Sequence, residues 1–144
     1  MKAKIYITID NSSPKLTEKN YGYVLECMIN RSAITREGFG KTTGTYHQAT
    51  LTAMAEALGR FEKSCEICIC TEDEFVLNMI NHNIATWAEN DFLTSKKKPV
   101  ANQKAWMEVW KLIKRHKVLG KPGKHEYAEW IRREIKNREE KRHV

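Results

Sequence analysis

The hydrophobic pattern of this chain changes its period part-way along, and that change limits the folds it can adopt. Residues 4–10 alternate strictly between apolar and polar side chains, which predicts a strand. Two further β-rich runs cover 21–29 and 33–43, and Asn30-Arg31 between them is suited to a tight turn. Three strands with short connections predict an antiparallel meander.

Helical spacing begins after the meander, from Leu51 to Phe61, and residues 65–71 then predict a fourth strand. The remaining predicted elements are a helix over 75–80, a short helix around Trp87, a long helix around Trp106, a strand over 116–119 and a last helix around Trp130. This order predicts an α/β fold with a mixed five-stranded sheet. Three antiparallel strands would be followed by two parallel ones, with helices on both faces of the sheet.

The composition limits the class of protein. The 144 residues suit one domain over 1–144, with a charged helix end over 137–144. Hydrophobic residues at 41% and charged residues at 30% exclude a membrane protein and a disordered one. The first residues, MKAKIYITID, lack the apolar segment of a secretory signal, so we expect a cytoplasmic chain with reduced cysteines. Zinc binding is disfavoured because strand alternation sends Cys68 and Cys70 to one face and Cys65 to the other.

Charge is divided unevenly along the chain. Residues 1–95 carry 9 Lys/Arg against 12 Asp/Glu, whereas residues 96–144 carry 16 against 6. A basic part beside an acidic part is expected where one surface meets a polyanion and another holds carboxylates. A solubilising surface with a charged tail helix accounts for the same numbers, and charge alone does not separate the two interpretations.

Five short segments occur in a distinctive order. Asp10 ends the first strand, and Gln48-Ala49-Thr50-Leu51 opens the first helix. The other three segments are Thr71–Val76, Lys98–Asn102 followed by Trp106, and Glu126–Trp130. Together they resemble the ribonuclease H family, in particular its ribonuclease HI-like members, along nearly the whole chain. The resemblance implies that family's fold and its activity, which is cleavage of the RNA strand of an RNA–DNA hybrid with two magnesium ions held by four carboxylates.

The resemblance places the four metal-binding positions at Asp10, Thr50, Glu72 and Glu129. Only Asp10 keeps the family residue. Glutamate in place of aspartate keeps the charge but moves the oxygens by about 1.5 Å, whereas magnesium demands near-octahedral geometry. Thr50 stands in a glutamate position and removes a negative charge outright. The alternatives are Asp73 as a reserve ligand beside Glu72, and Glu126 in place of Glu129.

A basic segment lies before the long helix. Lys96, Lys97 and Lys98, with Trp87 upstream, resemble the basic protrusion with which some family members grip hybrid. Contacts of this kind to phosphates would give affinity without sequence preference. The alternative is a solvated loop, with no role in binding.

Three side chains near predicted helix starts have two interpretations each. His47 and Gln48 lie where the family touches the minor groove, which displays 2′-hydroxyls in A-form-like duplexes. Thr45 can equally cap the helix there. His125 matches a histidine in a flexible loop of the family that helps product release, or it is an ordinary exposed residue.

We therefore predict a nucleic-acid-binding member of the family that binds RNA–DNA hybrid or another duplex, with hydrolysis weak or lost. Magnesium or manganese would be its cofactor if a metal is used. One alternative is an active metal-dependent endoribonuclease using Asp10, Glu72 and Glu129. The other is a non-catalytic scaffold whose basic face binds a protein partner.

Overall fold

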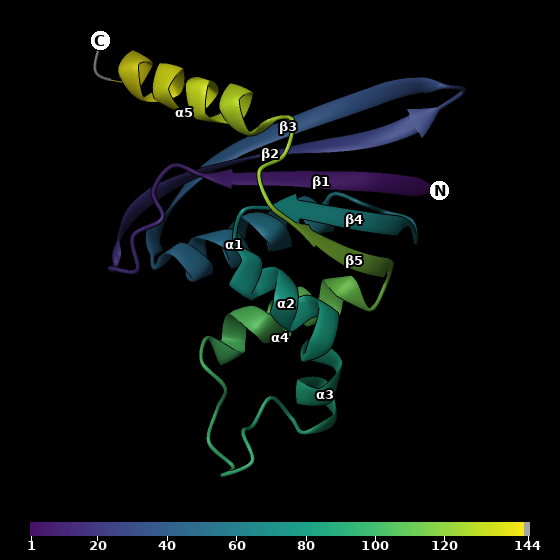
Figure 1. Ribbon diagram of the computed structural model, residues 1–144, viewed down its shortest axis with the longest axis vertical. Helices are drawn as coiled ribbons and strands as arrows, with labels where there is room; N and C mark the ends of the chain where they lie inside the picture. The colour runs from purple at the N-terminus through teal and green to yellow at the C-terminus, as the bar shows by residue number, and fades with distance from the viewer. Residues whose placement is uncertain (143–144) are drawn as a thin grey trace.

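Five strands form one mixed sheet in the order β3-β2-β1-β4-β5 (Figure 1). This is a computed structural model, and it describes residues 1–142. The strands are β1 (Lys2–Ile9), β2 (Thr17–Ile29), β3 (Ser32–Gly44), β4 (Glu66–Thr71) and β5 (Lys117–Pro122). Pairing is antiparallel from β3 through β2 to β1, and parallel from β1 through β4 to β5. The predicted sheet is therefore confirmed.

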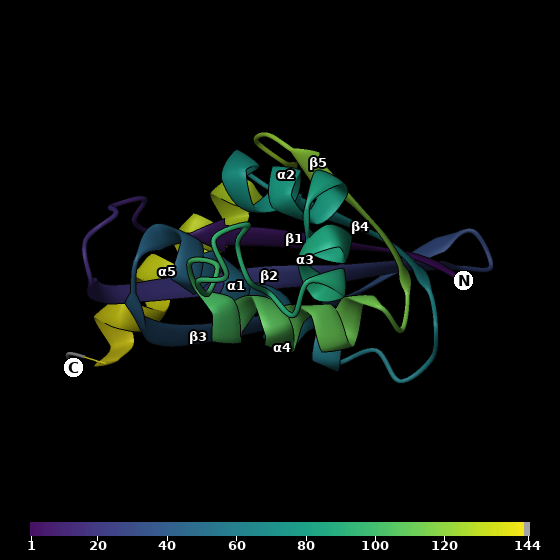
Figure 2. The same cartoon turned by 90° about the horizontal axis from the view of Figure 1, so that it is seen from below.

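Helices cover both faces of the sheet, as predicted (Figures 1 and 2). They are α1 (Tyr46–Gly59), α2 (Glu74–His82), α3 (Ile84–Glu89), α4 (Gln103–Ile113) and α5 (Ala128–Arg142). The last helix, α5, lies alone on one face, and the other four lie on the opposite face. The charged helix end expected over 137–144 is helical to Arg142, and 143–144 lie outside the described residues.

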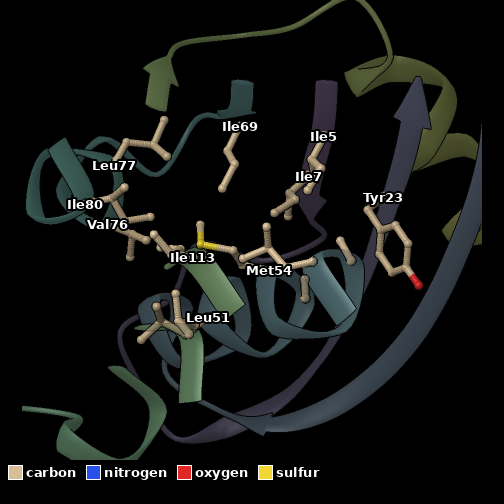
Figure 3. Packing of buried hydrophobic residues seen from close by; sticks show 14 of the residues in the cluster. Ile5, Ile7, Tyr23, Leu51, Met54, Ile69, Val76, Leu77, Ile80 and Ile113 are labelled. Carbon is tan, nitrogen blue, oxygen red and sulfur yellow. The ribbon is translucent and has the colours of Figure 1, made fainter. Parts of the chain in front are cut away.

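Strand alternation divides the buried residues between two clusters. Ile5, Ile7 and Ile69 point toward α1, α2 and α4 and form the larger core with Met54 (Figure 3). The smaller cluster, under α5, is Tyr6, Val24, Cys70, Ile131 and Ile135. Because odd and even positions of β1 enter different clusters, the sheet is buried on both faces where α5 covers it.

The cysteines follow the same alternation. Cys70 belongs to the cluster under α5 with Cys68 packed against it, whereas Cys65 belongs to the larger core. Cys68 and Cys70 have their sulfur atoms 3.9 Å apart, and both thiols are free. The predicted division of the cysteines between the two faces is confirmed, so these residues are part of the packing.

The hairpin between β2 and β3 turns at Asn30 and Arg31, as predicted. Both residues have positive φ angles, 51° and 69°, and the flanking pair Ile29 and Ser32 closes the turn. A two-residue turn with both central residues in this region matches the twist of the two strands. The turn therefore fixes the long register of β2 against β3.

Close packing against Gly22 positions α5. A Cβ atom at Gly22 would lie 2.6 Å from Cγ2 of Ile131 and 2.8 Å from the Phe39 ring. Only a residue without a side chain therefore lets α5 approach β2 this closely.

None of the helices in residues 1–142 has the length and apolar character needed to cross a membrane.

Candidate active site and nucleic-acid interface

Asp10 and Glu72 follow the carboxyl ends of β1 and β4, which are parallel neighbours. Ile7 pairs with Thr71 in that register, so both acids lie just beyond the same edge of the sheet. By strand alternation, Asp10 lies on the same face of the sheet as Tyr6, and Glu72 lies on the same face as Cys70. The sequence therefore places both carboxylates at one edge and on the side of the sheet that carries α5.

Asp10 is held by the neighbouring strand. Its two carboxylate oxygens accept hydrogen bonds from the backbone amide and the side-chain amide of Asn20, at 2.9 and 3.0 Å. The side-chain amide of Asn20 also donates to Glu139 on α5. Glu139 is therefore the α5 acid that shares a hydrogen-bond partner with Asp10.

Glu72 and Glu129 meet at one arginine. Nη2 of Arg132 donates to Glu72 at 2.6 Å, and Nη1 lies 3.7 Å from Glu129. Glu129 also pairs with Lys124 at 2.8 Å, and this hydrogen bond is the main cause that lowers the pKa of the Glu129 carboxyl. Two carboxylates are thus matched by two cations.

Thr50 supplies no ligand at this edge. The residue is completely buried in α1, and its hydroxyl donates to the carbonyl of Tyr46 at 3.1 Å. A threonine hydroxyl commonly bonds to the preceding turn of its own helix in this way. The glutamate position of the resemblance is therefore occupied by a neutral group that is already hydrogen-bonded.

Asp73, the reserve ligand, faces away from solvent. It is 2% exposed, and its carboxylate caps α2 by accepting the amide of Val76. Both carboxylate oxygens lie within 3.0 Å of Nδ1 of His47, and because a carboxylate only accepts, that nitrogen carries the proton. The His47 ring packs against Phe75 with centroids 4.6 Å apart. Asp73 thus orients His47.

His125 is fixed through both ring nitrogens. Nδ1 accepts the amide of Tyr127 at 3.2 Å, so Nε2 carries the proton and lies 2.9 Å from the carbonyl of Ile7 and from the hydroxyl of Thr8. Burial lowers the pKa of the ring, against the raising effect of the Ile7 carbonyl. The interpretation of His125 as an ordinary exposed residue is wrong, because its ring packs between β1 and the start of α5.

The start of α1 is capped and is tied to the start of α4. Thr45 accepts the Gln48 amide, and the Gln48 side chain accepts the Thr45 amide, which is a capping box. The same Gln48 side chain donates to Asn102 at 2.9 Å. Capping by Thr45 is confirmed, and Gln48 joins α1 to the segment that carries the lysines.

The three lysines lie at the tip of a structured loop, which we call the lysine loop (residues 90–102). The Thr94 amide donates to the Lys98 carbonyl at 2.7 Å, which closes a tight turn, and Lys96, Lys97 and Lys98 are all exposed. Trp87, before the loop, packs edge-on against buried Trp106 at 5.3 Å. Trp87 is therefore partly buried and supports the base of the loop.

The donor set does not fit a two-metal centre in this arrangement. Among residues 1–142, no three His, Cys, Asp or Glu side chains are grouped as a metal ion would require. Glu72 and Glu129 are brought together by Arg132, while Asp10 is bonded to Asn20 and Thr50 is neutral. Neither Arg132 nor Glu139 was predicted from the sequence. The only sequence signal was the helical i, i+3 spacing of Arg132 from Glu129.

The chain matches the RNase H family model over residues 2–121. It is 30% identical to Ribonuclease H of Campylobacter curvus over 112 residues, which are 78% of this chain and 68% of that protein. It is 34% identical to Ribonuclease HI of Neisseria meningitidis serogroup B over 79 residues, 55% of this chain and 54% of that protein. The family match ends before α5, so Glu129 and His125 lie beyond it.

Solved structures share the fold at low sequence identity. LC9-RNase H1, described as a type 1 RNase H with the type 2 active-site motif, has a TM-score of 0.70 and 13% identity, with 92% of this chain and 69% of that chain covered. The PFV RNase H domain has a TM-score of 0.63 and 16% identity, with 88% and 79% covered. The foamy viral protease-reverse transcriptase, solved in complex with RNA/DNA hybrid, has a TM-score of 0.63 and 15% identity, with 84% and 17% covered.

Proposed function

This chain belongs to the RNase H family, and we propose that it binds RNA–DNA hybrid or a related duplex while metal-dependent hydrolysis of the RNA strand is weak or lost. The relatives from Campylobacter curvus and Neisseria meningitidis are named ribonucleases, and one structural neighbour was solved with an RNA/DNA hybrid. Those properties belong to the related proteins. For this chain the proposal rests on the lysine loop and on the acidic edge, by which we mean Asp10, Glu72 and Glu129 beyond the carboxyl ends of β1 and β4.

The observation that carries the proposed binding is the junction of α1 with the lysine loop. Gln48, at the start of α1, holds Asn102, at the end of the loop. His47 lies beside Gln48 with its side chain 40% exposed, and Lys96–Lys98 are exposed on the same loop. His47 is placed to hydrogen-bond in the minor groove of a duplex, and the three lysines are placed to contact the phosphates beside that groove.

Weak or lost hydrolysis follows from charge. Two-metal hydrolysis needs converging carboxylates that hold two ions about 3.5–4 Å apart. Thr50 contributes no charge, and the charges of Glu72 and Glu129 are already balanced by Arg132 and Lys124. Glu72 and Glu129 therefore have little negative charge left with which to attract divalent cations, and Asp10, bonded to the neutral amides of Asn20, is the acid of this set that keeps its charge.

Active cleavage is the second candidate, and one observation favours it. Asp10 and Glu72 lie beyond the ends of adjacent parallel strands, where side-chain movement would let them share an ion. In this alternative Glu129 would join them after releasing Arg132. Cleavage that needs magnesium or manganese and is abolished by Asp10→Asn would support this candidate over the first.

The binding proposal is tested by fluorescence anisotropy with a labelled hybrid over a series of salt concentrations. We expect affinity to fall steeply with salt, and the triple change of Lys96, Lys97 and Lys98 to Ala to reduce the slope of log K against log salt by about 2–3. The matched control removes the same charge at the opposite end of the sheet. It changes Lys2, Lys63 and Lys117, all exposed, to Ala, and we expect the slope to stay near that of the wild type.

Two results would contradict the proposal. Absence of hybrid binding at low salt would favour the scaffold alternative. Equal loss of affinity in both triple variants would show that binding depends on net charge and that the lysine loop has no special part in it.

A further inference from the structure

We infer that Arg132 is a resident cation of the acidic edge and stands where a divalent metal ion would otherwise bind between Glu72 and Glu129. This inference deepens the proposed function. It rests on the proposed function in one respect, because it takes Glu72 and Glu129 as the residues at the family's metal positions. It gives a specific cause for the weak metal binding proposed above and identifies the residue whose removal would create a cation site.

The geometry of the guanidinium supports this role. Nη2 and Nη1 of Arg132 face different carboxylates, Glu72 at 2.6 Å and Glu129 at 3.7 Å. Glu72 follows β4, whereas Glu129 and Arg132 lie in the first turns of α5. A planar, permanently charged fork can serve two carboxylates at once, and this is also the bridging role of a metal ion. Arg132 therefore joins the sheet edge to α5.

The charge of Arg132 also acts on the start of α1. The pKa of Tyr46 is raised to about 12, mainly by burial and then by the charges of Asp73 and Glu72, against the lowering effect of Arg132. Arg132 is therefore within electrostatic range of Tyr46, whose carbonyl accepts the Thr50 hydroxyl. The charge of Arg132 thus acts on the first turn of α1, the helix that carries Thr50.

The pairing of Glu72 and Glu129 with cations leaves a metal ion little to gain from these two carboxylates. The negative charges of Glu72 and Glu129 are matched by Arg132 and Lys124. Magnesium gives up its hydration water reluctantly and binds where uncompensated carboxylates repay that cost. A divalent ion at this edge would have to displace the guanidinium, or bind a few ångström from it and be repelled.

The test is binding of Mn²⁺ alone, followed by the loss of the free Mn²⁺ signal in electron paramagnetic resonance, with the full chain and no nucleic acid. We expect no saturable site at submillimolar Mn²⁺ in the wild type. We expect Arg132→Gln to bind Mn²⁺ on the order of tenfold more tightly, because a unit charge a few ångström from a divalent ion changes affinity by about that factor in a wet site.

Two further variants separate the role of this arginine from a general change in charge. Arg132→Lys keeps a cation at the same position and is expected to stay metal-free. Lys141→Ala removes the same charge from the exposed far end of α5 and is expected to leave Mn²⁺ binding unchanged. Circular dichroism and thermal melting check that each variant is folded. If Arg132→Gln does not fold, Arg132→Lys still tests the inference, because tight Mn²⁺ binding by Arg132→Lys would overturn the role of Arg132.

The inference is overturned if wild type and Arg132→Gln bind Mn²⁺ equally, whether tightly or not at all. Hybrid binding is measured on the same proteins in EDTA. If hybrid binding is absent while Arg132→Gln gains Mn²⁺, the proposed function fails and the role of Arg132 stands. If hybrid binds and no variant gains Mn²⁺, the role of Arg132 fails and the proposed binding stands.

Discussion

The carboxylate of Asp73 accepts the Nδ1 proton of His47 at 2.8 Å and thereby joins the start of α2 to the start of α1. Asp73 is buried, whereas the His47 side chain is 40% exposed. A buried acid that bonds one ring nitrogen fixes the orientation in which the ring presents its other nitrogen. The pair therefore holds an imidazole ready at the proposed nucleic-acid surface.

Two substitutions at Asp73 separate its two tasks. Asparagine is also a good N-cap, so Asp73→Asn is expected to keep most of the stability of α2 while weakening hybrid binding through a less ordered His47. Asp73→Ala loses the cap as well, and we expect it to lower the free energy of unfolding by about 1 kcal/mol more than Asp73→Asn does. Urea denaturation and hybrid anisotropy measure the two effects. Equal hybrid affinity in wild type, Asp73→Asn and His47→Ala would contradict the role of the pair in binding.

Lys19 is the most unexpected buried residue. Its side chain is completely buried, and Nζ donates to the carbonyls of Lys15 and Gly44 and to the hydroxyl of Thr17 at 2.7–2.8 Å. Lys19→Met would leave these acceptors without a donor, so we expect a loss of about 1–3 kcal/mol in the free energy of unfolding. The exposed Lys15→Met is the matched control and should change stability little. Unchanged melting of Lys19→Met would show that solvent replaces the lost donor.

Local patterns predicted the sheet because alternation and helical spacing are properties of short segments. Ile5 and Ile7 are in the core, and Asn30-Arg31 makes the turn, as local sequence rules require. The environment of Lys19 could not be predicted, because a lysine in a strand pattern ordinarily points to solvent. Its acceptors come from three other residues, one of them 25 positions away.

The candidate site was predictable in part. The resemblance to the ribonuclease H family placed Asp10 and Glu72 together, and the parallel pairing of β1 with β4 puts both acids at one edge of the sheet. The partners of these acids depend on how α5 crosses the sheet, which local patterns do not specify. Arg132 and Glu139 therefore emerged only from the tertiary structure.

Acidification is expected to destabilise the fold through His125. Burial lowers the pKa of its ring below the ordinary value of 6.5, so the unfolded chain binds the proton more readily than the folded one. The contribution of His125 to the free energy of unfolding is fully present above about pH 6.5. It falls as the pH drops from there toward the pKa of the ring in the folded chain. Melting temperatures between pH 7.5 and 5 should fall less steeply for His125→Asn than for the wild type. An exposed control, His82→Asn, should keep the wild-type slope, and identical slopes in all three proteins would contradict this account.

The contact between α5 and β2 is tested at Gly22. A methyl group there would meet Ile131 and Phe39, so we expect Gly22→Ala to destabilise the chain by about 1–3 kcal/mol. Hydrogen exchange should accelerate in α5 more than in α1. Gly59→Ala is the control, because a methyl group there has no neighbour within 4 Å and should be neutral or stabilising. Equal exchange rates in α5 of both variants would show that α5 does not depend on this contact.

The claim that this chain binds hybrid without efficient cleavage is tested on one gel. A hybrid labelled on its RNA strand is incubated with the wild-type chain in EDTA, in magnesium and in manganese, and each sample is run on a native and on a denaturing gel. We expect a shifted complex under all three conditions and an RNA strand that stays largely intact. Rapid metal-dependent cleavage that disappears in Asp10→Asn, or no shifted complex under any condition, would contradict the claim.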